Sequence, residues 1–169
     1  IGDWSSDVCS SDLESESGGW MNAMNAFDLS RPNIAAHATG LSRAAYEHAL
    51  QYSNERQTFG KPLHKHQAIQ FILADMKTSI EASRMLTWKS AADADAGIRN
   101  TESAAHAKRF AADTAMQVST DAVQVYGGYG YSEEYPVARL MRGAKVMQIY
   151  EGSSQVQRMI IGREITKNL

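Results

Sequence analysis

Apolar residues along most of this chain recur every three to four positions, which is the period of an α-helix with one buried face. After His66, five such residues share one face: Ile69, Ile72, Leu73, Met76 and Ile80. An alanine-rich stretch over residues 101–125 has a similar face, and its small side chains favour close contact between helices. No sustained alternation of apolar and polar residues predicts a strand. The pattern therefore predicts an all-α fold.

Prolines and glycines mark the edges of the predicted helices. Pro32 follows Asp28 and Ser30, either of which can cap free backbone N–H groups, so the first helix is predicted to begin near Pro32. It runs to about Glu55 and is ended by Gly60-Lys61-Pro62. The other helices are predicted over about 66–93, 101–125, 136–147 and 154–169. Long helices joined by short breaks are typical of an antiparallel four-helix bundle, here with one short extra helix.

Composition narrows the class of protein. A chain of 169 residues with 43% hydrophobic and 21% charged residues is one ordinary globular domain. A net charge of −2 gives no reason to expect nucleic acid or an anionic membrane as partner. The apolar runs are much shorter than the roughly 20 residues of a membrane span. A single Cys cannot form an intrachain disulfide, which fits a reducing compartment.

We expect the first thirteen residues to have a different origin from the rest. Residues 3–13 match the translation of a short-read sequencing adapter, so we expect 1–13 to be an artefact; a natural polar linker is the alternative. Without them the chain loses three Asp, no Lys or Arg, and Cys9, which changes the net charge to +1. We expect residues 14–29 to be a linker and entry segment, and 30–169 to form the bundle domain.

One candidate motif is the string Glu55-Arg56-Gln57-Thr58-Phe59-Gly60-Lys61-Pro62. Arg56 and Thr58 at a helix end can satisfy terminal carbonyls, and on its own the string favours this capping role. The same residues also suit a pyrophosphate, because guanidinium binds phosphate oxygens bidentately.

A second motif is the glycine-rich string over residues 124–131. Glycines allow a tight turn and let the backbone approach a ligand closely. The string lacks the spacing of a dinucleotide-binding loop after a strand, so a turn alone is the commoner meaning.

A third motif surrounds Glu151, in Gln148-Ile149-Tyr150-Glu151-Gly152-Ser153-Ser154. A carboxylate between apolar residues and a glycine can be partly desolvated, which suits a general base. Ser153 and Ser154 can cap the final helix, and their N–H groups can face an anion. Taken alone, Glu151 is more often an exposed loop acid.

Together these strings resemble the acyl-CoA dehydrogenase family, most closely its medium-chain, straight-chain branch. Residues 20–28, Ser30-Arg31-Pro32 and 141–145 also match in order and spacing, and the resemblance covers residues 19–169. It implies the C-terminal helical domain of that family, without the N-terminal helical and middle β-domains. We therefore expect the chain to be a fragment that is inactive alone.

The resemblance implies a reaction in which FAD oxidises acyl-CoA to trans-2-enoyl-CoA, as in fatty-acid β-oxidation. Glu151 matches the base that removes the α-proton while a hydride leaves the β-carbon for the flavin. Some branches place the base on the first bundle helix instead. The matching position here is Ser30, which cannot act as that base.

The resemblance also implies binding residues. Asp28, Arg31 and Gly152 match positions on the acyl-CoA side. The positions that match FAD contacts form three groups: Arg56, Gln57, Thr58, His66 and Gln67 on the pyrophosphate side; Gln124, Gly127 and Gly128 on the adenosine side, across the subunit boundary; and Ser153, Ser154 and Gln155 for the subunit's own FAD. No metal site is expected.

The expected partners follow from the same resemblance. They are an acyl-CoA substrate, an electron-transfer flavoprotein and further copies of the chain, in a tetramer as is common in the family. The expected location is the bacterial cytoplasm, or the mitochondrial matrix in a eukaryote. Alternatives are an acyl-CoA oxidase or flavin monooxygenase of the same fold, and a non-catalytic helical oligomerisation module.

Overall fold

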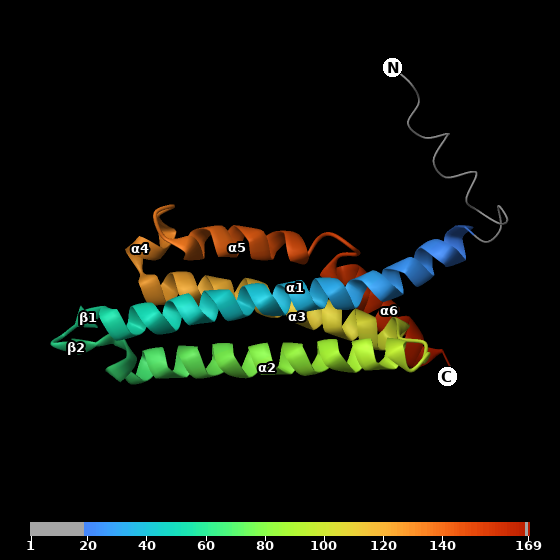
Figure 1. Ribbon diagram of the computed structural model, residues 1–169, viewed down its shortest axis with the longest axis horizontal. Helices are drawn as coiled ribbons and strands as arrows, with labels where there is room; N and C mark the ends of the chain where they lie inside the picture. Colours follow the sequence, from blue (N-terminus) through green and yellow to red (C-terminus); the bar gives the residue numbers. More distant parts are fainter. Residues whose placement is uncertain (1–18, 168) are drawn as a thin grey trace, which may run out of the picture.

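The computed structural model describes residues 19–167 and 169, which form a helical bundle. The predicted adapter-derived segment, with Cys9, lies outside the described residues. Three long helices, α1 (Gly19–Glu55), α2 (Gln67–Asp95) and α3 (Thr101–Tyr126), run side by side with α5 (Pro136–Met147) along the long axis of Figure 1. A last helix, α6 (Ser154–Thr166), packs on α3 near one end. The predicted all-α fold is confirmed.

Short elements complete the chain. Strands β1 (Gln57–Thr58) and β2 (Lys61–Pro62) form a small antiparallel hairpin that pairs Gln57 with Pro62 and Thr58 with Lys61. A 3-10 turn, η1 (Leu63–Lys65), leads into α2, and α4 (Gly128–Tyr131) follows α3. The sequence pattern predicted breaks at both places but neither the hairpin nor α4, because two to four residues are too few for a periodic signal.

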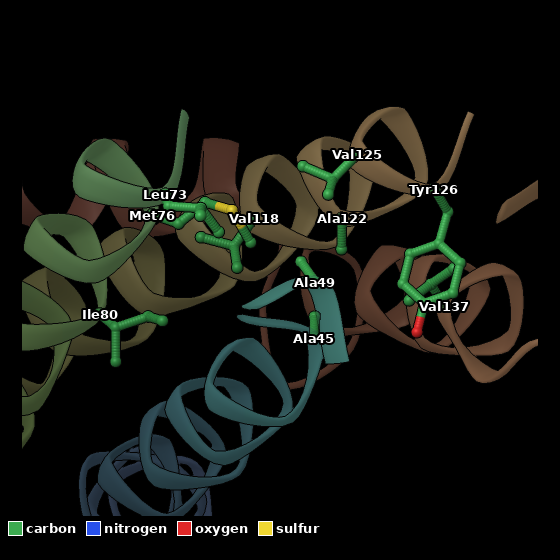
Figure 2. Close-up of a cluster of buried hydrophobic side chains, with 10 residues drawn as sticks. All are labelled: Ala45, Ala49, Leu73, Met76, Ile80, Val118, Ala122, Val125, Tyr126 and Val137. Atoms are coloured by element: carbon green, nitrogen blue, oxygen red, sulfur yellow. The ribbon is translucent and has the colours of Figure 1, made fainter. Parts of the chain in front are cut away.

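Helix α3 lies at the centre and contacts α1, α2, α5 and α6. Figure 2 shows its Val118, Ala122 and Val125 against side chains of α1 and α2. The predicted apolar face of α2 is confirmed, since Leu73, Met76 and Ile80 are buried. A second core cluster is mostly alanine: Ala35, Ala38, Ala107, Ala111, Ala112, Ala115, Ala144 and Met147. Small side chains at these positions let α1, α3 and α5 approach closely.

The prediction that Pro32 opens the first helix was wrong, because α1 begins at Gly19 and contains Pro32. A proline inside a helix has no N–H for the carbonyl four residues earlier, here that of Asp28. The side chain of Asn100 supplies the missing donor, with its Nδ2 3.0 Å from the Asp28 carbonyl oxygen. Figure 1 shows the N-terminal part of α1 bending away from the bundle, as expected at a proline. The other predicted helix boundaries agree with the structure to within about two residues at each Gly or Pro break.

Among the described residues, no helix has the length and apolar character required to cross a membrane.

Candidate functional site

The loop between α5 and α6 has an unusual backbone. Glu151 has a φ of 55° and Gly152 a φ of 86°, so two consecutive residues are left-handed. This conformation is easy for glycine and costs a residue with a side chain about 1–2 kcal/mol. Ser153 then caps α6, and its Oγ accepts from the Val156 N–H at 3.4 Å. The predicted cap is confirmed, and the cap places Glu151 just before the first turn of α6.

The carboxylate of Glu151 meets α1. The Ser30 hydroxyl donates to Glu151 Oε2 at 2.8 Å, although the two residues lie 121 positions apart in the chain. The two alternative base positions of the family resemblance therefore lie beside each other. Only the carboxylate can accept a proton as a base, and the hydroxyl orients it.

An ion pair between a buried arginine and a partly buried aspartate lies next to this carboxylate. Arg31 is only 3% exposed, and its Nη1 donates to Asp28 Oδ1 at 2.6 Å. The Thr101 hydroxyl also donates to the Asp28 carboxylate. Burial lowers the pKa of Arg31, and the negative charges of Asp28 and Glu151 partly offset this effect. The sequence-predicted residues Asp28, Arg31 and Glu151 are thus brought together, with positive charge close to the carboxylate.

Two buried side chains hold the loop from inside the bundle. Lys108 of α3 donates from Nζ to the Gly152 carbonyl oxygen at 2.7 Å. Gln157 of α6 donates from Nε2 to the same oxygen at 2.9 Å and to the Glu151 carbonyl oxygen at 3.3 Å. Sequence reasoning missed both residues. Lys108 interrupts the alanine face of α3 that also contains Ala104 and Ala111, and a lysine on an apolar face was the available signal.

Asp113 connects the loop to α3 and was also missed. Its carboxylate accepts from Ser154 Oγ at 2.9 Å, Gln148 Nε2 at 2.8 Å and Arg158 Nη2 at 3.1 Å. The Ser154 hydroxyl, predicted at the cofactor site, is therefore bonded inside the domain. Gln155 is exposed on the outer side of α6.

The other predicted residues gather at the β1–β2 end of the bundle. A groove of about 610 Å³ there is lined by Tyr52, Arg56, Thr58, Leu63, Val125, Tyr126, Gly127, Gly128 and Tyr129. The Arg56 guanidinium lies 5.7 Å from the centre of the Tyr129 ring. Cβ atoms added to Gly127 or Gly128 would meet nothing within 4 Å. The first two motifs therefore meet in one groove with open space along its backbone.

The remaining predicted residues surround this groove. Thr58 Oγ1 lies 3.1 Å from His66 Nε2, which ties the hairpin to the start of α2. Gln57, Gln67 and Gln124 are exposed at the same end. Their amide side chains are therefore available to a ligand or to a second protein surface.

The two groups of residues lie at opposite ends of the domain. In Figure 1 the loop between α5 and α6, with α6 itself, lies toward the end of the bundle opposite the β1–β2 hairpin. The part of α1 from Ser30 to Glu55 is about 38 Å long at the rise of an α-helix. A single small ligand cannot reach both groups within one chain.

Comparison with known proteins identifies relatives of the whole domain. A profile of the family described as acyl-CoA dehydrogenase, C-terminal domain, matches residues 17–166. The chain is 52% identical to cyclohexane-1-carbonyl-CoA dehydrogenase of Geobacter metallireducens over 155 residues, which cover 92% of this chain and 41% of that protein.

Solved structures share the fold. Butyryl-CoA dehydrogenase from Megasphaera elsdenii matches with a TM-score of 0.89 at 52% identity, covering 90% of this chain and 40% of that one. A chain in a structure described as the electron transferring flavoprotein of Acidaminococcus fermentans matches with a TM-score of 0.90 at 46% identity, covering 91% and 40%. This chain therefore spans about two fifths of the length of the relatives that it matches.

Proposed function

Because this chain belongs to the acyl-CoA dehydrogenase family through its C-terminal domain, we propose that the whole protein oxidises an acyl-CoA to its trans-2-enoyl-CoA, with Glu151 as the base. The observation that carries this proposal is the Glu151 carboxylate, oriented by Ser30 at 2.8 Å on a left-handed loop beside a buried arginine. Similarity to dehydrogenases of butyryl-CoA and cyclohexane-1-carbonyl-CoA supports an acyl-CoA thioester as the substrate class. A role in fatty-acid β-oxidation is part of the proposal.

The residues around Glu151 have different roles in the proposed reaction. Ser30 holds Oε2, and within the described residues Oε1 accepts no hydrogen bond, so this oxygen is available to take the α-proton. An α-proton of a thioester is weakly acidic, and its removal requires stabilisation of the negative charge that develops on the substrate. The nearby positive charge of Arg31 and the N–H groups at the start of α6 supply such stabilisation.

The groove at the other end fits the nucleotide part of FAD. Among the described residues Arg56 makes no ion pair, so its guanidinium is free to bind a phosphate. The open backbone at Gly127 and Gly128 leaves room for a ligand at close range. When bound, FAD supplies the hydride acceptor, and the chain's own residues bind and orient it.

A second copy of the chain completes the cofactor site in this proposal. The distance of about 38 Å along α1 exceeds the length of an extended dinucleotide, so one FAD cannot contact both ends of a single chain. A site that combines the Glu151 end of one copy with the Arg56 groove of another removes this difficulty. We therefore propose a homo-oligomer, with four copies as the expected number.

The proposed electron acceptor is an electron-transfer flavoprotein, supported by the similarity to a chain in the Acidaminococcus fermentans structure. Anaerobic reduction of the whole protein by acyl-CoA, followed by exposure to either oxygen or the flavoprotein, tests this choice. Fast reoxidation by oxygen alone would favour an acyl-CoA oxidase.

The decisive experiment replaces Glu151 with Gln in the whole protein. The variant keeps the shape of the side chain but removes the base, so flavin reduction by butyryl-CoA should slow by about 10²–10⁴-fold. The FAD content should stay unchanged, which separates loss of the base from loss of the cofactor. Flavin reduction at the wild-type rate in Glu151→Gln would overturn the assignment of Glu151 as the base. A whole protein that contains no FAD would instead favour a non-catalytic helical module.

A second experiment tests the cofactor groove without measuring turnover. Arg56→Met should weaken FAD binding to the whole protein by about tenfold or more, as measured by fluorescence titration. The matched control is Arg43→Met, because Arg43 is an exposed arginine of α1 that pairs with Glu47 away from the groove. Equal FAD affinity in the two variants would refute the assignment. We expect this 169-residue chain alone to bind FAD weakly and to oxidise no acyl-CoA.

A further inference from the structure

Lys108 is a buried cation whose hydrogen-bond partner is a peptide group. Its side chain is 0% exposed, and Nζ lies 2.7 Å from the Gly152 carbonyl oxygen. Among the described residues, no carboxylate lies within ion-pair distance of it. Burial lowers the pKa of Lys108 to about 8. The negative charges of Asp113 and Glu151 partly offset this lowering, whereas the positive charge of Arg31 adds to it. Packing alone does not require an ammonium here, since a neutral side chain of similar size avoids the cost of desolvating a charge.

Gln157 adds a second unfavourable group at the same loop. Its side chain is also 0% exposed, and its Nε2 donates to the carbonyl oxygens of both Glu151 and Gly152. Its Oε1 is buried, and no hydrogen-bond partner for it lies in the described part of the chain. A buried acceptor without a partner costs about 1–3 kcal/mol. Two costly buried side chains that both bond to one strained loop are typical of a functional region rather than of ordinary core packing.

The two side chains determine which way the peptide groups of the loop face. Every peptide bond of the described chain is trans, so the carbonyl and the N–H of one peptide point in opposite directions. The carbonyl groups of Glu151 and Gly152 are held inward, toward α3 and the buried face of α6. The N–H groups of the same peptides, which belong to Gly152 and Ser153, must then face outward. No acceptor among the described residues takes either of them.

We propose that Lys108 and Gln157 are positioning residues that hold the Glu151–Gly152 loop in its left-handed conformation. Their hydrogen bonds to the Glu151 and Gly152 carbonyl oxygens orient the Glu151 carboxylate toward the substrate. The same bonds leave the N–H groups of Gly152 and Ser153 on the outer face of the loop. This inference rests on the proposed function of Glu151. It assigns to α3 a direct role in arranging the base, although Lys108 itself faces the core.

The test compares stability with chemistry in the whole protein. Lys108→Met removes the buried charge with an unbranched side chain only one atom shorter, and Gln157 still donates to the Gly152 carbonyl oxygen. The melting temperature should therefore stay the same or rise. The single-turnover rate of flavin reduction by butyryl-CoA should fall by about tenfold or more, because a small displacement of a catalytic group has large effects on rate. The α-deuterium isotope effect should remain at least as large as in the wild type.

A second variant and a control make the outcome decisive. Gln157→Met removes the amide donor and should slow reduction in the same way at unchanged FAD content. Ser119→Ala is the matched control, because this hydroxyl of α3 is buried and, among the described residues, bonds only the Met116 carbonyl of its own helix. Reduction rates within twofold of wild type in both loop variants would overturn the inference. If Glu151→Gln also reduces flavin at the wild-type rate, then the proposed function itself fails rather than the positioning role.

Discussion

Gly152 offers a direct test of the loop geometry through the stability of this chain. Its φ of 86° lies in the left-handed region, and a Cβ added there would lie 2.6 Å from Gln157 Nε2 and 3.6 Å from Val156 Cγ1. Gln157 cannot move aside freely, because it is fully buried and bonded to two carbonyl groups. Gly152→Ala therefore combines backbone strain with a forced displacement of Gln157.

The expected magnitude follows from these two contributions. A left-handed conformation costs alanine about 1–2 kcal/mol relative to glycine. Displacing Gln157 weakens two hydrogen bonds, each with a net value of about 0.5–1.5 kcal/mol. The free energy of unfolding should fall by about 3 kcal/mol, which for a domain of this size lowers the melting temperature by about 6–12 °C.

Calorimetry or thermal unfolding followed by circular dichroism measures this change. Gly162→Ala is the matched control, because Gly162 lies inside α6 with nothing within 4 Å of its added Cβ. That variant should gain up to about 1 kcal/mol, since alanine is the better helix former. The double variant Gly152→Ala/Gln157→Ala, compared with Gln157→Ala alone, separates the two contributions. It retains the backbone strain at residue 152 but no longer has the Gln157 side chain that the added Cβ would overlap. A Gly152→Ala protein within about 0.5 kcal/mol of wild type would refute the left-handed loop.

Three further predictions concern the buried polar groups. The pKa of Lys108 falls from its ordinary value of 10.5 to about 8 on folding, so the unfolded chain binds the additional proton between these values and stability rises with pH across that range. In urea titrations, the free energy of unfolding of the wild type, measured relative to that of Lys108→Met, should rise by on the order of 2 kcal/mol between pH 7 and 9.5. If the difference between the two proteins does not change with pH, the lowered pKa is contradicted. Asn100→Ala should cost about 1–2 kcal/mol by leaving the Asp28 carbonyl unpaired, and Pro32→Ala should recover part of this loss by restoring an N–H; strictly additive effects would argue against the shared carbonyl. Asp113→Asn should cost about 2 kcal/mol in the same titrations, because three side chains donate to this carboxylate, and a change below about 0.5 kcal/mol would count against that network.

Most of the fold was predictable because helix boundaries depend on nearby residues. The starts of α3 at Thr101 and α5 at Pro136 agree with the predictions, and α2 starts one residue after the predicted His66, since capping residues and Gly or Pro breaks act over a few positions. Pro32 was the exception. Its place inside α1 depends on Asn100, which lies 68 positions later and supplies the donor that proline lacks.

The candidate site was predictable in part. The string around Glu151 identified the loop, and Ser30 was recognised as the alternative base position. Their hydrogen bond was not predictable, because it joins residues 121 positions apart. Lys108 and Gln157 were missed, since a lysine and a glutamine are usually exposed and only packing shows that both are buried.

The sequence by itself determined the helical class, the breaks between helices and the family to which this chain belongs. Periodicity, turn residues and local motifs each depend on residues that are close together in the sequence. Only the tertiary structure decided which polar groups face inward, how the Glu151 loop is held and where the two groups of motif residues lie. The physical reason is that burial and hydrogen bonding depend on elements that meet in space. Packing of α1 and α6 against α3 brings Ser30, Lys108 and Gln157 to a single loop.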